Sequence, residues 1–333
     1  MKVLVLQGKS ITPTISTQQL LDRYDQLKEY EDIEYKVICK DPNMSFDDYD
    51  RILEDYDALI GMWITSDVLV EQLFINHPKL KYIATTSHGF EQFDKEMVNR
   101  YGVTITNTIY GDTTIAQYAM ALLLEICHHV ANQCHYTKVD YFNEPDAQFC
   151  VALQRHIEIT DKTVGVIGLG SIGYHFAKIA HGFGCKVIGY DLFKKDDPKY
   201  DFIEQVSLDE LLNQADIISL HCPLTDSTEN IINDESISKM KDGVILINTA
   251  RGKLIDEDAL VRGLDSGKIY SVGLDVLVDE RPTKPTKLIE HPNAIVTGHV
   301  AWLSDESRYR TVDLAIKNFI NYKNGQPTSV ISK

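Results

Sequence analysis

The sequence predicts an α/β protein with two doubly wound parallel sheets, and three observations lead to this prediction. Short apolar segments rich in β-branched residues alternate with amphipathic segments along the chain. A glycine-rich turn at residues 168–173 follows one of these apolar segments near the middle of the chain. The length of 333 residues suggests two domains, at roughly 100–200 residues each. Strands that alternate with helices form parallel sheets covered by helices on both faces.

Five apolar segments in the first third of the chain have the length and composition of strands. They are residues 3–6, 35–39, 58–61, 82–85 and 103–106. Amphipathic segments such as residues 18–30 lie between them and predict helices. We therefore expect one parallel sheet in this part of the chain.

A long apolar segment at residues 113–130 predicts a buried helix. Its apolar residues occupy nearly every face, so the helix must be covered on several sides. A helix that joins two lobes and a helix at a subunit interface satisfy this requirement equally well. Residues 136–158 show no clean period, and we expect a loop or a short helical turn there.

A second series of alternating elements begins at Thr163 and predicts a second sheet, so that the chain forms two units of unequal size. The expected strands are residues 163–167, 186–190, 217–220, 244–248, 271–276 and 294–297. The expected helices are residues 172–183, 208–214, 256–264 and 306–322.

The composition is that of an ordinary globular chain, with 44% hydrophobic and 25% charged residues. The formal net charge of -16 disfavours nucleic acid and anionic membranes as partners. No apolar run approaches the roughly 18 residues of a membrane-spanning helix, and the N-terminus shows no export signal. We therefore expect a cytoplasmic protein without nucleic-acid or membrane partners.

The six cysteines include no C-x-x-C pair, so we expect reduced and mostly buried thiols. The stretch from Cys127 to His135 combines cysteines and histidines and raises the question of a metal site. Its spacing matches no zinc pattern, and the stretch continues an apolar helix. We expect no metal there.

The glycine-rich turn has the spacing G-x-G-x-x-G, and its position between a strand and a helix indicates a dinucleotide site. Gly168 permits the tight turn, and Gly170 lets the backbone approach a pyrophosphate. Gly173 allows the helix and the strand to pack closely. The free N–H groups at the start of the helix favour a phosphate at this place.

The next expected strand ends at Asp191, where a carboxylate accepts hydrogen bonds from the adenosine ribose. Its charge repels a 2′-phosphate, which favours NAD over NADP. Lys194 and Lys195 are close enough in sequence to reach a phosphate and to weaken this preference slightly. Two alternatives for the turn are an α/β domain that binds no nucleotide and a methyl-donor enzyme.

Three further segments, residues 219–225, 248–252 and 273–276, lie at or near the ends of expected strands. Ligands of open parallel sheets bind at the carboxyl ends of the strands, so these segments lie where a cofactor would. With these segments the chain resembles the D-isomer-specific 2-hydroxyacid dehydrogenases, most specifically in residues 160–305.

The resemblance implies two Rossmann-like domains with the active site in the cleft between them. Residues 1–107 together with 302–333 would form the substrate-binding domain. Residues 108–301 would form the NAD-binding domain.

The family's motifs also imply three catalytic residues. Arg251, in the N-x-A-R-G segment, would hold the substrate carboxylate and orient the 2-oxo group. Glu280 would hydrogen-bond a histidine and favour its protonated form, with Asp279 as the alternative because the local sequence departs from the family. His299 would protonate the carbonyl oxygen as hydride reaches C2. A surface ion pair is the alternative role for Arg251.

Family position assigns further cofactor contacts. The pyrophosphate would contact Ser171 and Ile172, the adenosine and ribose would contact Cys222, Pro223 and Thr228, and the nicotinamide side would be formed by Thr249, Ala250, Arg251 and Asp275. For Asp275 the alternative is a buried carboxylate satisfied by the backbone.

On the substrate side, backbone N–H groups around His88 and Gly89 would assist Arg251. Glu91 stands where the family often has Asn. Trp63 would cover a small substrate or would belong to a core or an interface, and both possibilities stay open.

The resemblance therefore implies NADH-dependent reduction of a small 2-oxo acid to the D-hydroxy acid. Pyruvate would make the chain a D-lactate dehydrogenase, whereas hydroxypyruvate or glyoxylate would make it a glycerate dehydrogenase or hydroxypyruvate reductase. The helix at 113–130 and the family both suggest a homodimer. The alternatives are an NADH-sensing interaction protein and a formate- or phosphite-type dehydrogenase. Glu280 argues against the formate type, which carries Gln as the histidine's partner.

Overall fold

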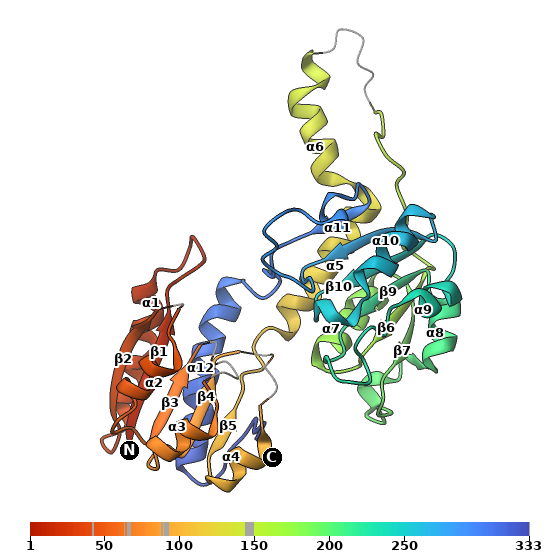
Figure 1. Cartoon of the computed structure of the whole chain (residues 1–333). Helices are drawn as coiled ribbons and strands as arrows, with labels where there is room; N and C mark the ends of the chain where they lie inside the picture. The colour runs from red at the N-terminus through yellow and green to blue at the C-terminus, as the bar shows by residue number, and fades with distance from the viewer. Residues whose placement is uncertain are drawn as a thin grey trace. The chain divides into compact units, whose positions relative to one another are not determined.

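The computed structural model describes residues 1–41, 43–62, 64, 68–87, 89, 93–143 and 150–332, and they form two compact units. The first unit is Met1–Gly111 with Leu303–Lys333, and the second unit is Asp112–Trp302. Each unit contains one parallel sheet with helices against it (Figure 1). The predicted α/β class with two doubly wound sheets is confirmed. The units meet in sequence at Gly111 and Trp302 instead of the expected 107 and 301, and their roles remain predictions.

The first unit has its strands in the order β2-β1-β3-β4-β5, all parallel. The strands are β1 (Lys2–Gly8), β2 (Glu34–Lys40), β3 (Ala58–Gly61), β4 (Tyr82–Thr85) and β5 (Thr104–Thr106). The helices are α1 (Thr17–Asp22), α2 (Phe46–Ile52), α3 (Glu71–Asn76), α4 (Lys95–Arg100) and α12 (Asp305–Lys323). The helix expected at 18–30 is α only in its first part, because it continues as the 3-10 helix η1 (Arg23–Glu29).

The second unit has its strands in the order β12-β11-β10-β9-β6-β7-β8, again all parallel. The strands are β6 (Thr163–Ile167), β7 (Lys186–Tyr190), β8 (Glu204–Gln205), β9 (Ile217–Leu220), β10 (Val244–Asn248), β11 (Ile269–Leu274) and β12 (Ala294–Val296). The larger helices are α5 (Asp112–His128), α6 (Val130–Val139), α7 (Ser171–Gly182), α8 (Leu208–Gln214) and α10 (Glu257–Asp265). The smaller ones are α9 (Asp234–Lys239), α11 (Lys287–Glu290) and the 3-10 helices η2 (Tyr141–Asn143), η3 (Pro198–Tyr200) and η4 (Gly252–Leu254).

The strand order of the second unit reverses at β6, which lies between β7 and β9. This reversal is the topological switch point at which open α/β sheets bind ligands. Side chains on both faces of the sheet are buried, as alternate residues such as Val166 and Ile167 enter different core clusters. Sheets buried on both faces have the continuous apolar strands that made the sequence prediction possible.

The region after α5 differs from the prediction. The apolar helix ends at His128, because His129 adopts a left-handed conformation with φ 49°. A second helix, α6, then extends into the segment that was expected to be a loop. None of its residues is buried, so no hydrophobic period marked it in the sequence.

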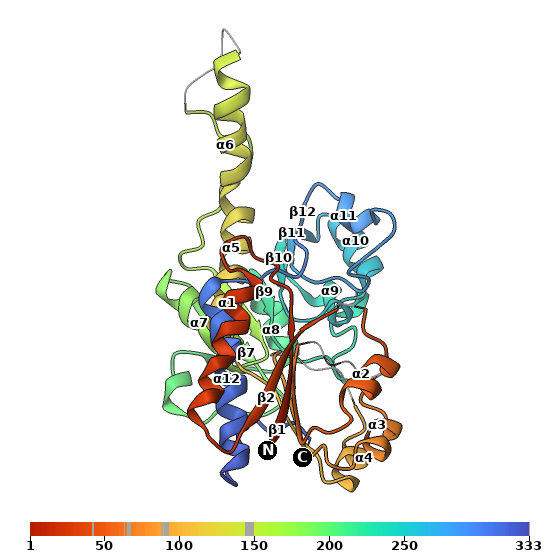
Figure 2. The ribbon, with the colours of Figure 1, turned by 90° about the vertical axis from the view of Figure 1, so that its left-hand side faces the viewer.

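We call residues 130–143 and 150–156 the arm. Figures 1 and 2 both show α6 projecting away from the sheet of its own unit. The returning chain runs beside it, since Gln133 Nε2 donates to the carbonyl of Val151 at 3.0 Å. Its exposed apolar residues are Val130, Val139, Phe142, Val151 and Leu153.

The cysteines correct one expectation. Cys127, Cys185 and Cys222 are buried, but Cys39, Cys134 and Cys150 are exposed, so the thiols are not mostly buried. Within the described ranges, no helix has the length and apolar character needed to cross a membrane, and no group of three or more possible ligands is arranged to hold a metal ion.

Candidate active site

The glycine-rich turn joins β6 to α7 at the switch point. Gly168 has φ +95°, and a side chain there would meet the backbone of Cys222 at 2.5 Å. A Cβ at Gly173 would lie 1.9 Å from the carbonyl oxygen of Gly168, so the first turn of α7 packs directly on the loop. Gly170 faces open space, with nothing within 4 Å of an added Cβ. The turn therefore has the shape of a backbone cradle for a pyrophosphate at a helix N-terminus.

Asp191 follows β7 and is tied to the turn. Its Oδ2 accepts the N–H of Leu169 at 2.8 Å. Its Oδ1 accepts the N–H of Phe193 at 2.9 Å. The carboxylate thus lies beside the glycine turn, where the ribose of a bound dinucleotide would be.

The other residues expected at the cofactor lie around the same edge of the sheet. Cys222 is buried at the end of β9, and burial raises the pKa of its thiol to about 11, with Asp191 acting in the same direction. Thr228 Oγ1 donates to the carbonyl of Pro223 at 2.7 Å, so these two residues form one turn. Ser171 Oγ donates to Asp112 Oδ2 at 2.7 Å, which joins the starts of α7 and α5. Ile172 packs against the core below the turn.

The buried hydroxyl of Thr249 indicates whether the residues of this site fit a cofactor. Its Oγ1 is buried and lacks a hydrogen-bond partner among the described residues. Buried hydroxyls normally have a partner, so this atom is suited to a ligand. The unpartnered hydroxyl, the open side of Gly170 and the Asp191 carboxylate together fit a bound dinucleotide.

Arg251 stands on a turn that is shaped by its own neighbours. Asn248, fully buried at the end of β10, accepts from the N–H of Ala250 at 2.9 Å and donates to the carbonyl of Arg251 at 2.9 Å. Arg251 Nη1 donates to the carbonyl of Ala250 at 2.7 Å. The backbone conformation that presents the guanidinium is therefore set by the side chain of Asn248, the first residue of the N-x-A-R-G segment.

Gly252 brings this turn against the segment that carries the acid. An added Cβ at Gly252 would lie 2.0 Å from the carbonyl carbon of Leu277 and 2.4 Å from the nitrogen of Val278. Only glycine allows such an approach of two backbones. The Arg251 turn and the segment leading to Glu280 are thereby held next to each other.

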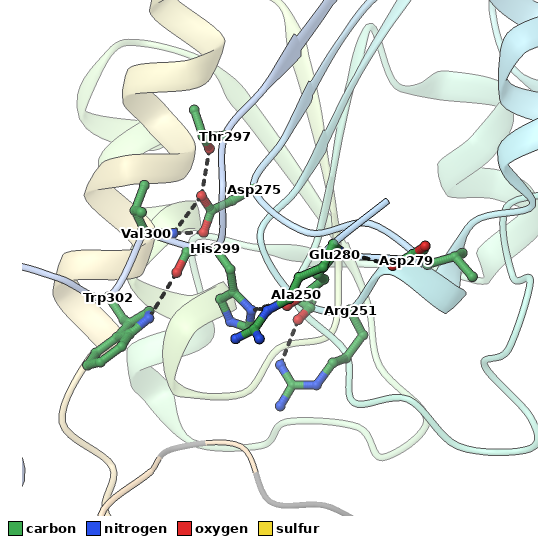
Figure 3. Close-up of polar contacts among 12 residues, drawn as sticks. Ala250, Arg251, Asp275, Asp279, Glu280, Thr297, His299, Val300 and Trp302 are labelled. Atoms are coloured by element: carbon green, nitrogen blue, oxygen red, sulfur yellow. Dashed lines mark hydrogen bonds and ion pairs between the residues drawn. The ribbon is translucent and has the colours of Figure 1, made fainter. Parts of the chain in front are cut away.

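His299 and Glu280 form a pair. The Nδ1 atom of His299 lies 3.0 Å from Glu280 Oε2 (Figure 3). Asp279, the alternative acid, instead accepts the N–H of Arg281 at 3.0 Å. Because Nδ1 faces the carboxylate, Nε2 is the nitrogen left to exchange a proton with another molecule.

Asp275 anchors the loop that carries His299. The residue is 1% exposed at the end of β11. Its Oδ1 accepts from Thr297 Oγ1 at 2.6 Å and from the N–H of Val300 at 2.9 Å, and its Oδ2 accepts from the N–H of Ala301 at 2.8 Å (Figure 3). This geometry favours the backbone-satisfied alternative for Asp275, and its contact with nicotinamide stays a prediction.

The same loop contains two contacts that the sequence did not reveal. His299 has φ 57°, a left-handed conformation that costs roughly 1–2 kcal/mol in a residue with a side chain. The indole nitrogen of Trp302 donates to the carbonyl of His299 at 3.0 Å, and the N–H of His299 donates to the carbonyl of Asp275 at 2.8 Å. The only sequence signal was the closeness of these residues to the predicted histidine.

The predicted substrate loop is described only in part. His88, Glu91 and Trp63 lie outside the described residues. Gly89 follows β4 in the first unit. The roles expected for these residues remain predictions.

A glycine turn at the switch point, a carboxylate after the next strand and a histidine–carboxylate pair at the same edge define a dinucleotide-binding oxidoreductase domain. Comparison with known proteins agrees. The model of the D-isomer specific 2-hydroxyacid dehydrogenase family, NAD binding domain, matches residues 120–301. Hydroxypyruvate reductase of Blautia hydrogenotrophica is 37% identical over 296 residues, which cover 86% of this chain and 91% of that protein.

Two solved structures extend the comparison to the whole chain. D-lactate dehydrogenase with NAD⁺ from Lactobacillus jensenii has a TM-score of 0.78 and 27% identity, with 100% of each chain covered. An acyclic imino acid reductase in complex with NADPH and D-Arg has a TM-score of 0.80 and 28% identity, covering 99% of this chain and 100% of that one. The protein belongs to the D-isomer-specific 2-hydroxyacid dehydrogenase family. It is an oxidoreductase that uses a nicotinamide cofactor.

Proposed function

We propose that the protein is an NAD-dependent D-2-hydroxyacid dehydrogenase that reduces a small 2-oxo acid. The observation that carries this proposal is the 3.0 Å pair of His299 and Glu280 on a loop anchored by a buried carboxylate. Such a pair is suited to deliver a proton at one fixed place. Asp191, near the glycine turn, supports NAD as the preferred nucleotide.

Each residue of the site has a defined task in this reaction. The Arg251 guanidinium binds the substrate carboxylate through two parallel hydrogen bonds and orients the 2-oxo group. Nε2 of His299 donates a proton to the carbonyl oxygen, and Glu280 stabilises the imidazolium before the transfer. When bound, the reduced nicotinamide supplies the hydride that reaches C2. In the opposite direction Nε2 of His299 removes the hydroxyl proton.

We propose hydroxypyruvate or glyoxylate as the first substrate candidates, giving D-glycerate or glycolate. The similarity to a hydroxypyruvate reductase supports this choice. Pyruvate, giving D-lactate, is the second candidate, supported by the likeness to D-lactate dehydrogenase. One methylene or hydroxyl changes binding in a small pocket by only about 1–3 kcal/mol, so we expect overlapping activity on all of them.

We further propose that two copies of the chain form a homodimer through the arm. Phe142 is 78% exposed and Val130 is 63% exposed, although apolar surface of this kind is costly in water. Helix α6 has no buried residue within one copy. A second arm would supply the missing packing. The cytoplasmic location remains a prediction.

The test is NADH oxidation with hydroxypyruvate, glyoxylate and pyruvate, comparing wild type with His299→Ala. We expect the variant to lose at least about 100-fold in kcat, because a positioned proton donor contributes about 10²–10⁴-fold. NADH binding measured by calorimetry should stay within about threefold of wild type, which shows that the fold is intact. Asp279→Asn is the matched control, since Asp279 accepts the N–H of Arg281, whereas the acid paired with His299 is Glu280.

The substrate panel also separates the competing functions. A chain that binds NADH but reduces no 2-oxo acid would support the NADH-sensing alternative. NAD⁺ reduction with phosphite or formate, without activity on 2-oxo acids, would support a phosphite- or formate-type dehydrogenase. Equal rates for wild type and His299→Ala would show that the proton donor is misassigned.

A further inference from the structure

The carboxylate of Asp191 is already shared by three donors. The carboxylate accepts hydrogen bonds from the N–H groups of Leu169 and Phe193. It also forms an ion pair with Lys195, whose Nζ lies 3.2 Å from Oδ1. A carboxylate offers about four lone-pair positions. The structure therefore leaves room for about one hydroxyl, whereas a ribose presents two.

Lys195 is partly buried and has several contacts in this site. Its side chain is 25% exposed and that of Asp191 is 15% exposed, so their ion pair is partly shielded from water. Gln205 of β8 holds the backbone of Lys195 on both sides. Its Oε1 accepts the N–H of Lys195 at 2.8 Å, and its Nε2 donates to the carbonyl of Lys195 at 2.7 Å. The backbone of Lys195 is thereby fixed, and its ammonium contacts Asp191 beside the expected ribose site.

The neighbouring lysine has a different environment. Lys194 is 77% exposed, and its Nζ lies 3.5 Å from an oxygen of Asp196, which is 81% exposed. Exposed pairs of this kind contribute little. The two lysines carry the same charge and stand side by side in sequence, but only Lys195 contacts the carboxylate that would bind the ribose.

We propose that Lys195 sets how strongly the site discriminates between NAD(H) and NADP(H). It competes with the ribose hydroxyls for Asp191, and it offers a positive charge to a 2′-phosphate. Asp191 alone would reject that phosphate by charge repulsion, and Lys195 offsets part of this repulsion. The site therefore prefers NADH but still binds NADPH. This inference rests on the proposed function, because it requires a nicotinamide dinucleotide at the glycine turn.

The test is isothermal titration calorimetry with NADH and NADPH on wild type, Lys195→Met and Lys194→Met. For Lys195→Met we expect NADPH affinity to fall about tenfold, as for the loss of one charged hydrogen bond. NADH affinity should stay the same or improve up to about threefold, because Asp191 is released for the ribose. Lys194→Met removes the same charge and should change the ratio of the two affinities by less than about twofold.

A second pair of variants tests the coupling. Asp191→Asn should raise the affinity for NADPH by about tenfold or more, because the repulsion between Asp191 and the 2′-phosphate is lost and Lys195 is released from its ion pair. Adding Lys195→Met to this variant should remove most of the gain in NADPH affinity. Circular dichroism melting confirms that each variant folds.

Three results would overturn the inference. The first is an equal loss of affinity for both nucleotides in Lys195→Met, and the second is a shift of the affinity ratio in Lys194→Met as large as that in Lys195→Met. The third is a gain in NADPH affinity in Asp191→Asn that survives in the double variant. Failure of wild type to bind either nucleotide is a different result. It would refute the proposed function, and the inference would fall with it.

Discussion

The loop at residues 297–302 and the arm belong to the same unit, but they are held in opposite ways. The loop donates three hydrogen bonds to the carboxylate of Asp275, which is 1% exposed, and the indole N–H of Trp302 donates to the carbonyl of His299. The arm has a helix without a buried residue, and its largest apolar side chain, Phe142, is 78% exposed. The loop is held by contacts within its own unit, whereas the apolar side chains of the arm are exposed.

This difference separates two kinds of functional structure. A proton donor, the role proposed for His299, must be held within a fraction of an ångström, and the contacts around His299 come from its own unit. The exposed apolar side chains of the arm would instead suit an association surface, as proposed above. Changes in the loop should therefore reduce turnover, whereas changes in the arm should alter assembly and leave the chemistry in place.

The largest effect is expected for Asp275→Ala. The variant leaves the N–H groups of Val300 and Ala301 without their acceptor and frees the strained conformation of His299. We expect kcat to fall about 100-fold, as for a displacement of about 1 Å, and the free energy of unfolding to fall by about 2–4 kcal/mol. Kinetics and urea unfolding measure the two quantities. Thr297→Val, which removes one of the donors, should lose only about 1 kcal/mol; an equal loss in both variants would show that Asp275 is not the anchor.

A smaller effect is expected for Glu280→Gln. The amide can still hydrogen-bond Nδ1 of His299 but no longer stabilises the imidazolium. We expect kcat for reduction to fall about 10–100-fold at neutral pH. A kcat equal to that of wild type would contradict this role, and Asp279→Asn is again the matched control.

The arm gives the converse prediction. Phe142→Ser should weaken the dimer about 10–100-fold, because burial of a large apolar side chain contributes about 1.5–3 kcal/mol. Light scattering across a dilution series measures the dissociation. Ile75→Ser, at a residue 53% exposed in the first unit, is the control and should leave the dimer intact. A wild-type chain that is monomeric at all concentrations would refute the proposed dimer through the arm.

The same contrast explains what the sequence could and could not predict. The strands were predicted closely because parallel strands buried on both faces are continuous apolar segments. The two-residue strand β8 was missed because so short a segment has no period. Helix α6 was missed because its residues meet no core, so the hydrophobic pattern that marks a helix is absent.

The site shows the same limit. Arg251, Glu280 and His299 were predicted from the motifs of the family that the chain resembles, and the structure brings Glu280 and His299 together. The two hydrogen bonds of Gln205 to the backbone of Lys195 join a strand to a loop residue ten positions earlier, and no local sequence pattern predicts them. Contacts that depend on the folded chain are in general visible only after folding.

The smallest expected effect is a pH dependence of stability that belongs to the core and not to the arm. His221 follows β9, its Nε2 lies 2.8 Å from Ser219 Oγ, and its ring packs on the buried Phe176. Burial lowers the pKa of His221 to about 3. The fold therefore holds the neutral imidazole, and the unfolded chain binds a proton below about pH 6.5.

The sign of the effect follows from this difference. The stabilisation is complete above about pH 6.5 and is lost as the pH falls from there toward about 3, by at most about 1.4 kcal/mol per pH unit. The residue keeps some exposed surface, so the measured slope should be below this limit. In urea unfolding at pH 7.5 and 5, His221→Gln should narrow the stability gap between the two pH values by about 1 kcal/mol. An unchanged gap would mean that another group controls the acid sensitivity of this fold.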